Sequence, residues 1–500
     1  MKRFKIVFWS LMFVGSMIFS NSCPAAQMII AQGTDAATLD PHLTLTWSDY
    51  NVINHICDGL IRRDQDMKIV PDLAESWKLI DPLTHEFKLR RRIKFHNGEP
   101  FDAQVVKFNI ERILDPKFSS RIKPFLEAIQ RVEVVDDYTV HIITKKPSPV
   151  LLNEILNVQM LPPKYVKEKG DQYVTRNPVG TGPYRFVGWV KDSHITLEAF
   201  EQHWRGKPSF DRLIFKPIPE DSTRVAALLA GEVDIITNVP PSEINRLKAH
   251  KEVMPLMIPS TRCMFIKLNT EKPPFNNKWV RQAINYAVDK DTLIEALFEG
   301  KVRKLDGQPL GPEYFGYNPD LKAYPYDPKK AKELLSKGGY PNGFEVEFDT
   351  SSGRYILDKE ASQAIAGQLL KVGVKAKVSV LEWGLLMKKY VEAHNMAPMT
   401  FFGIAARSID ADGMYTFDLA GSKFSYYHNE ERDRLVLEAR TIVDQNKRLN
   451  IYKKVSEIYR EDAPFLYLYQ QADIYGINKK CNWWKPRADS SIWIFQIPKS

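Results

Sequence analysis

The chain has 500 residues, of which 44% are hydrophobic and 26% charged, and its formal net charge is +9. This composition excludes an intrinsically disordered chain, and the interspersed lysines, arginines and acids form no basic block of the kind that binds nucleic acid. A chain of this length exceeds what one hydrophobic core holds, so we expect two or more lobes.

The first 26 residues have the composition of a secretory signal peptide. A basic start precedes an almost wholly apolar run from Ile6 to Phe19, and small residues follow. This run is too short to span a membrane, which takes about 20 apolar residues. We therefore expect residues 1–26 to be a signal peptide and the mature protein to reach the periplasm. Cleavage before Cys23 would attach a lipid there, whereas cleavage after Ala25 or Ala26 would leave the protein free.

Residues 61–189 have an α+β pattern. Strand-like segments such as His85 to Arg90 and Tyr138 to Thr144 surround a single helix that Asp102 caps. His96 lies in a turn of this region. We interpret it as a structural or exposed histidine rather than a metal ligand or a base.

Asn177 to Tyr184, with the sequence NPVGTGPY, is the most distinctive segment of the chain. Two glycines and two prolines in eight residues exclude a helix and a central strand, so we expect a rigid, turn-rich loop. It is not a phosphate-binding loop, because Pro183 and Tyr184 stand where such a loop carries Gly-Lys-Ser or Gly-Lys-Thr.

Two βαβ units follow, more than 100 residues apart. Each has a strand, a helix with an apolar face that a glycine ends, and a second strand. Such units favour parallel sheets, so we predict two α/β lobes. Between the units, Trp279 to Val288 should form a helix whose apolar stripe serves core packing. The expected elements are Leu213–Lys216, residues 221–229 and Val233–Ile236 in the first unit, and Phe344–Phe348, Asp358–Lys371 and Val374–Val380 in the second.

The sequence carries no recognisable catalytic or metal motif. It lacks Gly-x-Ser-x-Gly, His-Glu-x-x-His and a supported Ser-x-x-Lys, and its 10 histidines are scattered. Cys57, Cys263 and Cys481 have no metal-type spacing. One disulfide plus one free thiol is an alternative in an oxidising compartment, and we favour three buried free cysteines. We therefore expect a binding protein with no metal, no cofactor and no enzymatic activity.

Short motifs occur along the chain in a characteristic order. Besides Asn177–Tyr184, the segments are Leu39–Pro41, Asp58–Leu60, Pro71–Trp77, Phe87–Arg90, Phe95–Gly98, Pro100–Asp102, Gly231–Asp234, Val280–Lys290, Tyr326–Pro328 and Asp462–Phe465. Any one of them could arise by chance. The ordered set resembles the bacterial extracellular solute-binding proteins of family 5, the peptide, nickel and opine receptors of ABC importers.

The resemblance implies a two-lobed α/β fold of the periplasmic-binding-protein type, with an extra α+β subdomain inserted in the first lobe. The chain would cross between the lobes near residues 265 and 469, and these crossings would form the hinge. The implied parts are 27–60, 190–265 and 470–500 for the first lobe, 61–189 for the inserted subdomain and 266–469 for the second lobe.

The resemblance also implies ligand-binding residues. The arginine that holds the ligand carboxylate in peptide-binding members corresponds to Arg354, and a guanidinium suits a carboxylate. The family's amino-binding aspartate aligns with Arg407. Either Asp410 or Asp412 takes over that role, or the ligand lacks a free amino end there. Arg354 and Arg407 together would favour a ligand with two acidic groups or an opine-type conjugate, and a structural pairing of Arg407 with Asp410 or Asp412 is the alternative.

Aromatic side chains are expected to form the walls of the cleft. The candidates are Trp47, Tyr355 and Trp383, with Tyr415 and Trp493 as further ones.

The function implied is that of an extracytoplasmic receptor. It would capture a peptide or other small amino-acid-derived solute between two closing lobes and deliver it to the permease subunits of an ABC importer. We expect a monomer. The alternatives are a nickel-chelate or haem receptor of the same family, an envelope chaperone or chemoreceptor partner with this fold, and a secreted hydrolase.

Overall fold

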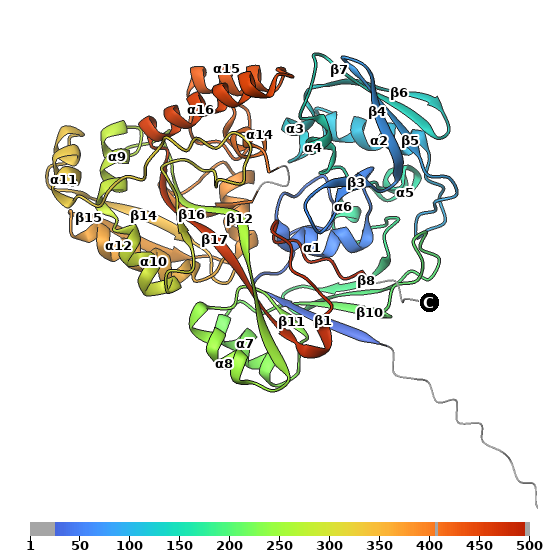
Figure 1. Cartoon of the computed structure of the whole chain (residues 1–500), viewed down its shortest axis with the longest axis horizontal. Coiled ribbons are helices and arrows are strands. Elements are labelled where there is room, and N and C mark those ends of the chain that lie inside the picture. Colours follow the sequence, from blue (N-terminus) through green and yellow to red (C-terminus); the bar gives the residue numbers. More distant parts are fainter. Residues whose placement is uncertain (1–25, 406–408, 496–500) are drawn as a thin grey trace, which may run out of the picture.

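The computed structural model describes residues 26–405 and 409–495, and it has two lobes that share one continuous β-sheet (Figure 1). Within the described residues the eleven strands of this sheet run in the order β15-β14-β16-β12-β17-β11-β1-β10-β9-β8, and β13 pairs with β17. The α/β class is therefore confirmed. The strands are β1 (Gln27–Gln32), β8 (Tyr184–Val190), β9 (His194–Ala199), β10 (Arg212–Pro217), β11 (Ile235–Ile236), β12 (Val253–Leu268), β13 (Arg303–Lys304), β14 (Phe344–Thr350), β15 (Val374–Val380), β16 (Met399–Ile404) and β17 (Phe465–Asn478).

The first lobe is built around β1, which lies between two parallel strands. β10 and β11 flank it, and α7 (Asp221–Leu229) connects these two strands along the chain. This is the first predicted βαβ unit, with β1 inserted between its strands. β9 and β8 extend the sheet in an antiparallel arrangement. The other helices of this lobe are α1 (Trp47–Ile56) and α8 (Ile244–Ala249).

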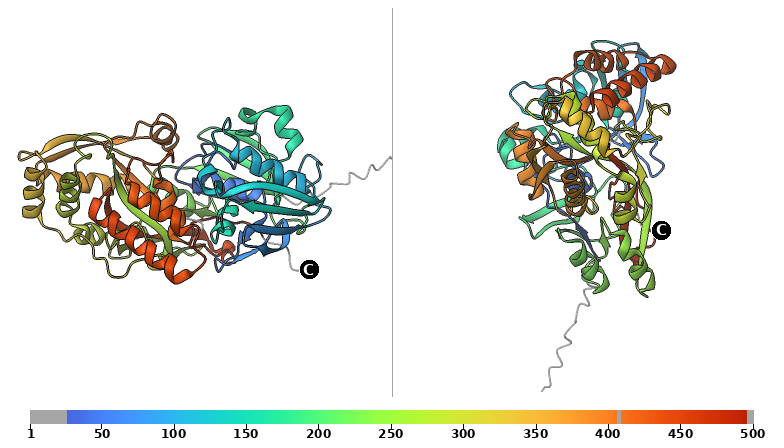
Figure 2. Two further views of the ribbon diagram at one scale, coloured as in Figure 1. Left: turned by 90° about the horizontal axis from the view of Figure 1, so that it is seen from above. Right: turned by 90° about the vertical axis from the view of Figure 1, so that its left-hand side faces the viewer.

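A second sheet, antiparallel and in the order β4-β5-β7-β6, lies beside the first lobe and has its own hydrophobic core (Figure 2). The helix predicted after Asp102 is α2 (Ala103–Leu114), and the Asp102 carboxylate accepts a hydrogen bond from the Val105 N–H at 3.1 Å. This part has the α+β pattern expected for the region. Its other elements are β2 (Ile61–Arg63), β3 (Ile69–Pro71), β4 (Ala74–Asp81), β5 (Thr84–Leu89), β6 (Ile129–Asp136), β7 (Thr139–Thr144), α3 (Lys123–Leu126), α4 (Leu151–Ile155), α5 (Pro163–Lys169) and α6 (Asp171–Val174).

The second lobe contains the second predicted βαβ unit. β14 and β15 are parallel neighbours, and α12 (Asp358–Leu370) connects them. The helix predicted between the two units is α9 (Lys278–Ala287), and every residue of its apolar stripe is buried. The remaining helices are α10 (Lys290–Phe298), α11 (Pro328–Lys337), α13 (Trp383–Met387), α14 (Ala411–Tyr415), α15 (Glu430–Ala439) and α16 (Gln445–Asp462).

Two long strands, β12 and β17, carry the chain between the lobes. They pair antiparallel on both sides of an irregularity that lies between Pro259 and Cys263 of β12. Before it, β12 pairs with the half of β17 that continues beside β11; after it, β12 also pairs with β16 of the second lobe. The predicted crossings near residues 265 and 469 lie on these strands, and the exact lobe boundaries stay a prediction.

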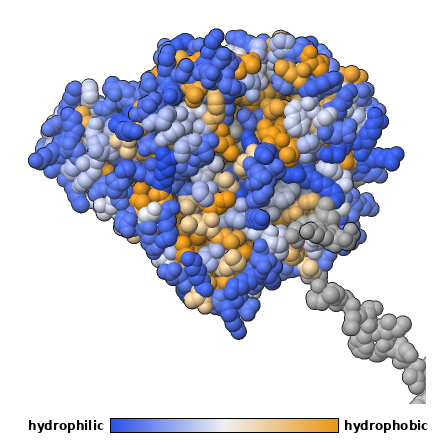
Figure 3. Space-filling view, viewed as in Figure 1, coloured by the Kyte–Doolittle hydropathy of each residue, from blue (hydrophilic) through white to orange (hydrophobic). Residues whose placement is uncertain are grey.

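Hydrophilic residues cover most of the face drawn in Figure 3, and hydrophobic residues form separate patches on it. In the part of the chain that the structure describes, no helix combines the length and the apolar composition that crossing a membrane requires. The predicted signal peptide, including Cys23, lies outside the described residues except for Ala26.

Cys57, Cys263 and Cys481 are free and buried, which confirms the favoured prediction. Burial raises the pKa of each thiol. These side chains therefore stay neutral and serve packing.

The loop at residues 177–184 packs against the C-terminal end of α1. The Gly182 N–H donates to the Ile56 carbonyl at 2.8 Å. His96 holds the loop from the other side, because its N–H donates to the Gly180 carbonyl and its ring Nε2 donates to the Gly182 carbonyl, both at 2.9 Å. Burial lowers the pKa of His96 to about 4. His96 is therefore a structural histidine, as predicted.

Replacing Gly180 by alanine should destabilise the protein. A Cβ at this position would lie 2.0 Å from the Ile56 carbonyl oxygen, and overpacking of this kind costs about 1–3 kcal/mol or more. The matched control is Gly188→Ala in β8, where nothing lies within 4 Å of the new Cβ. Urea unfolding should show a clear loss for the first variant and little change for the second, and equal stabilities would contradict the packing account.

His55 on α1 is buried and bonded through both ring nitrogens. Nδ1 donates to the Asn51 carbonyl at 2.7 Å, and Nε2 accepts from the Ile494 N–H at 2.9 Å, so the neutral ring ties the C-terminal segment to α1. Burial lowers the pKa of His55 from 6.5 to about 4. Between these pH values the unfolded chain binds a proton that the folded protein excludes. The contribution of His55 to the free energy of unfolding is therefore fully present above the pKa of the unfolded chain, and it is lost as the pH decreases toward 4.

The free energy of unfolding should therefore lose up to about 3 kcal/mol through His55 as the pH falls from 7 to 4. Urea titrations of the wild type and His55→Gln should show a shallower pH dependence for the variant. The exposed His428 offers a control, since His428→Gln should keep the wild-type dependence. Parallel curves for the wild type and His55→Gln would refute the assignment.

Candidate functional site

Three small pockets meet around Trp47, the first residue of α1, where the two lobes face each other. We call them the polar, aromatic and outer pockets, and their volumes are about 40, 30 and 40 Å³. Trp47 lines all three, and both lobes contribute to each. The polar pocket includes Asn51, Arg262, Arg354, Gln471 and Asp473; the aromatic pocket includes Arg262, Arg354, Tyr355, Trp383 and Phe424; the outer pocket includes Tyr50, Phe125, Glu154, Asp412 and Phe417.

Arg354 lies in a tight loop between β14 and α12. The Asp358 carboxylate accepts hydrogen bonds from the backbone N–H groups of Gly353, Arg354 and Tyr355 at 3.0 to 3.1 Å. Asn238 of the first lobe donates to the carbonyls of Gly353 at 3.0 Å and Arg354 at 3.2 Å. The loop is thus held from both lobes.

The Arg354 guanidinium has no acidic partner among the described residues. Its carbon lies 4.8 Å from the ring centroid of Tyr355 and 4.9 Å from that of Trp383, and its buried Nε lacks a hydrogen-bond partner. Burial, and then the charge of Arg262, lower the pKa of Arg354 to about 10, so it stays protonated at neutral pH. A buried cation without a counterion favours the binding of an anion.

Tyr355 and Trp383 form one wall of the aromatic pocket. Their rings meet edge to face with centroids 6.0 Å apart, and the Tyr355 hydroxyl donates to the Gly403 carbonyl at 3.1 Å. The buried Trp383 Nε1 has no hydrogen-bond partner in the described part of the chain. The structure therefore brings Arg354, Tyr355 and Trp383 together, with Trp47 on the opposite lobe. Their roles toward a ligand stay predictions.

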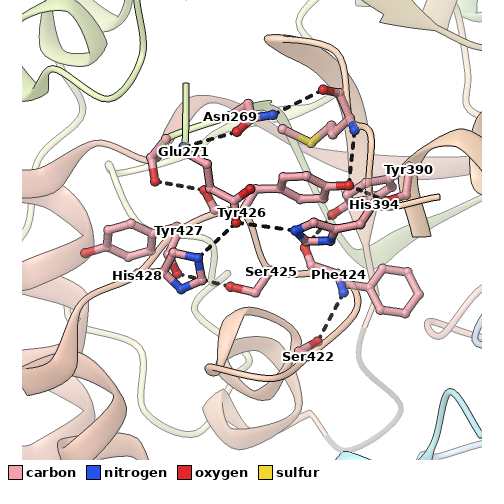
Figure 4. A network of polar contacts seen from close by, with 12 residues as sticks. Asn269, Glu271, Tyr390, His394, Ser422, Phe424, Ser425, Tyr426, Tyr427 and His428 are labelled. Carbon is pink, nitrogen blue, oxygen red and sulfur yellow. Dashed lines mark hydrogen bonds and ion pairs between the residues drawn. The ribbon is translucent and has the colours of Figure 1, made fainter. Parts of the chain in front are cut away.

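Phe424 borders the aromatic pocket, and a network of polar contacts positions it (Figure 4). The Tyr390 hydroxyl donates to the Phe424 carbonyl at 2.7 Å, and the Tyr426 hydroxyl donates to the Tyr390 carbonyl at 2.5 Å. The Tyr426 ring stacks on His394 with centroids 4.3 Å apart. This wall of the pocket is therefore fixed by the fold.

The acidic candidates have structural partners. Asp410 accepts from Arg448 through both carboxylate oxygens, at 2.7 and 2.8 Å, and it also caps α14. Asp412 lies 3.1 Å from the Arg440 Nε and borders the outer pocket. Burial and the adjacent Asp410 raise the pKa of Asp412. Arg407 lies outside the described residues, so its pairing stays open. These contacts favour a structural role for Asp410.

Tyr415 and Trp493, the further aromatic candidates, do not border the three pockets. The Tyr415 hydroxyl lies 2.6 Å from the Ser456 Oγ inside the second lobe. Trp493 stacks on His55 and borders a separate cavity of about 370 Å³ in the first lobe, together with Asp58 and Arg62. Neither is placed to touch a ligand at Trp47.

Several polar residues of the pockets were not predicted, and three of them lie on the two long strands. Arg262 comes from β12, and Gln471 and Asp473 come from β17. The signal that could have found them is a charged or amide side chain inside a long strand that is otherwise buried. Such a side chain has to be satisfied by a partner or by a ligand.

The lobes touch on both sides of the pockets. The backbones of Gly33 and Gly353 meet so closely that a Cβ on Gly33 would lie 1.5 Å from the Gly353 oxygen. At the outer side, Arg440 of the second lobe pairs with Glu154 and donates to the Phe125 carbonyl at 3.2 Å. The structure therefore represents a closed arrangement.

Replacing Arg440 by methionine should favour an open arrangement. The change leaves Glu154 of the first lobe without its cation in the closed interface, and breaking a buried pair in this way costs about 3–5 kcal/mol. In an open form the Glu154 carboxylate would reach water, so the cost falls on closure. Small-angle scattering of the natively purified protein should give a larger radius of gyration. Arg434→Ala on the exposed side of α15 is the control. An unchanged radius of gyration for Arg440→Met would show that Arg440 does not hold the lobes closed.

The fold and the pockets define a two-lobed ligand-binding protein. A family model described as bacterial extracellular solute-binding proteins, family 5 Middle, matches residues 68–426. The chain belongs to this family, as its motifs indicate.

Several known proteins resemble the chain over almost its whole length. The glutathione-binding protein GsiB of Pectobacterium atrosepticum is 31% identical over 482 residues, which covers 93% of this chain and 92% of that protein. Heme-binding protein A of Haemophilus influenzae is 32% identical, with 85% of this chain and 84% of that protein covered. The periplasmic binding protein DppA of Helicobacter pylori, solved with the peptide STSA, has a TM-score of 0.86 at 28% identity and covers 94% of this chain and 97% of that one.

Proposed function

We propose that this protein is the receptor of an ABC importer that captures a peptide or another small amino-acid-derived solute around Trp47 and delivers it to a membrane permease. The observation that carries the proposal is Arg354, a half-buried side chain at the lobe interface whose guanidinium has a buried Nε and no acidic partner among the described residues. A ligand carboxylate would supply the missing counterion. Membership of a family of solute-binding proteins supports the same function.

In this proposal Arg354 binds a carboxylate, and Trp47, Tyr355 and Trp383 pack against the body of the ligand. Arg407 is a second candidate for an acidic group. Asp412 borders the outer pocket and would contact a ligand that reaches it. Asp410 has a structural role, because its ion pair with Arg448 holds the start of α14 in place.

Binding is coupled to closure and not to chemistry. A ligand that contacts both lobes stabilises the closed form by its differential affinity for the two forms. The permease then recognises the closed form. The ligand should be released unchanged. The N-terminal segment would direct the protein to the periplasm, free or anchored through Cys23.

The pockets favour small ligands. Each of the three has a volume of about 30 to 40 Å³, and the lobes already touch beyond them at Gly33 and at Arg440. A long peptide would need a wider opening between the lobes.

Replacing Arg354 by alanine should weaken ligand binding by about 10- to 100-fold, because a charge-assisted hydrogen bond is lost. The ligand is first identified by mass spectrometry of the solute that the natively purified protein releases on denaturation, or by a thermal-shift screen of peptides, opines and metal chelates. Calorimetry then compares the wild type with the variant. Arg434→Ala, on the exposed side of α15, should bind as the wild type does. Wild-type affinity in Arg354→Ala, or turnover of the bound solute, would refute the proposal.

A second candidate function is the binding of haem or a metal chelate, which the similarity to Heme-binding protein A favours. The described residues contain no group of three or more histidine, cysteine, aspartate or glutamate side chains placed to hold a metal ion. A visible absorption spectrum of the natively purified protein separates this candidate from a colourless solute.

A further inference from the structure

The long strands β12 and β17 each contribute a charged residue to the lining of the polar pocket. Asp473 of β17 is 5% exposed, and Arg262 of β12 is 3% exposed. Arg262 lies in the irregular stretch between Pro259 and Cys263, where the pairing with β17 is interrupted. Both residues border the polar pocket, so their charges face the space between the lobes.

The Asp473 carboxylate has an unused hydrogen-bond acceptor. Its Oδ1 accepts from the Gln471 Nε2 at 2.7 Å, whereas its buried Oδ2 receives no hydrogen bond. The hydroxyls of Ser260 and Ser490 bond to each other at 3.3 Å. Burial raises the pKa of Asp473, and the charge of Arg262 and these two hydroxyls oppose the rise, so all three groups lie close to the carboxylate. The buried Oε1 of Gln471 also lacks a donor. Two acceptor oxygens on one strand therefore lack a donor in the described part of the protein, and both residues line this pocket.

Arg262 is a second buried cation, and its charge acts on Asp473, whose pKa it lowers against the larger rise that burial causes. Its guanidinium carbon lies 5.6 Å from the ring centroid of Tyr355, the same ring that Arg354 approaches to 4.8 Å. It forms no ion pair with Asp473 or with another acid among the described residues, and its charge lowers the pKa of Arg354. Two buried guanidinium groups repel each other unless an anion lies between or beside them.

We propose that the ligand of this site is an amino-acid-derived solute with one ammonium group and two carboxylates, in which Asp473 and Gln471 accept from the ammonium and Arg262 and Arg354 each pair with a carboxylate. This inference rests on the proposed function and specifies its ligand class. Asp473 then replaces the amino-binding aspartate of the peptide-binding members, because the position of that aspartate corresponds to Arg407 in this chain. The ligand then carries one net negative charge, which balances two arginines and one aspartate.

The charge class is tested with a thermal-shift screen of purified protein against small solutes that differ in charge. The panel consists of γ-glutamylglycine, which has one ammonium and two carboxylates, its N-acetyl derivative, its C-terminal amide and glycylglycine. The largest shift is expected for γ-glutamylglycine. If the N-acetyl, amide or neutral compound stabilises the protein most, the charge assignment is wrong while the receptor function stands. If no panel member and no solute of the broader screen binds, the proposed function fails and this inference fails with it.

The residue roles are tested by calorimetry on Asp473→Asn and Arg262→Gln. Asp473→Asn should lose about tenfold or more in affinity for γ-glutamylglycine, as expected for a charged hydrogen bond, and little for the N-acetyl derivative. Arg262→Gln should lose affinity for γ-glutamylglycine and little for its C-terminal amide. A merely structural role would weaken all ligands equally, and that outcome, or unchanged binding, would overturn the assignment. Thermal unfolding of each variant without ligand shows whether the fold is kept.

Discussion

The antiparallel pairing of β12 with β17 is the constraint on which the two-lobed arrangement depends. Because these strands run through both lobes and pair on each side of the irregularity at Pro259–Cys263, the lobes belong to one sheet. Arg262 and Asp473 lie next to the point where the ladder is interrupted, and Trp47 and Arg354 face each other from the two lobes. If the predicted hinge lies there, closure would bring Trp47 and Arg354 together, whereas Arg262 and Asp473 would move little.

Buried charges in this protein fall into two groups, and the difference separates structure from binding. Asp410 with Arg448, and Glu154 with Arg440, are paired and hold elements together. Arg354 has no acid within reach among the described residues, and it packs on aromatic rings instead. Leaving such a charge unpaired in a protein interior is expensive, and under the proposed function a ligand carboxylate would pair with it.

Much of the fold could be predicted from local patterns, and part of the site could not. The helix α9 and the second βαβ unit follow from periodicity and from glycines at helix ends, which are local signals. Arg354 could be proposed as a site residue because its loop matches a family motif, and the structure places it beside Tyr355 and Trp383. Arg262 and Asp473 were missed because they meet through the pairing of strands that are separated by about 200 residues along the chain. The partner of Asp410 comes from α16, and nothing near Asp410 in the sequence indicates it. Arg407 lies outside the described residues.

The backbone contact between Gly33 and Gly353 has a consequence for selectivity. At this point the lobes meet main chain to main chain, and main-chain atoms cannot adjust by changing rotamers. The closed form therefore has a fixed depth, and a ligand that is too large cannot be accommodated by a slightly looser closure without losing this contact and the bonds from Asn238. Under the proposed function, this backbone contact would limit the length of the ligand, independently of the charged residues that are proposed to bind its ends.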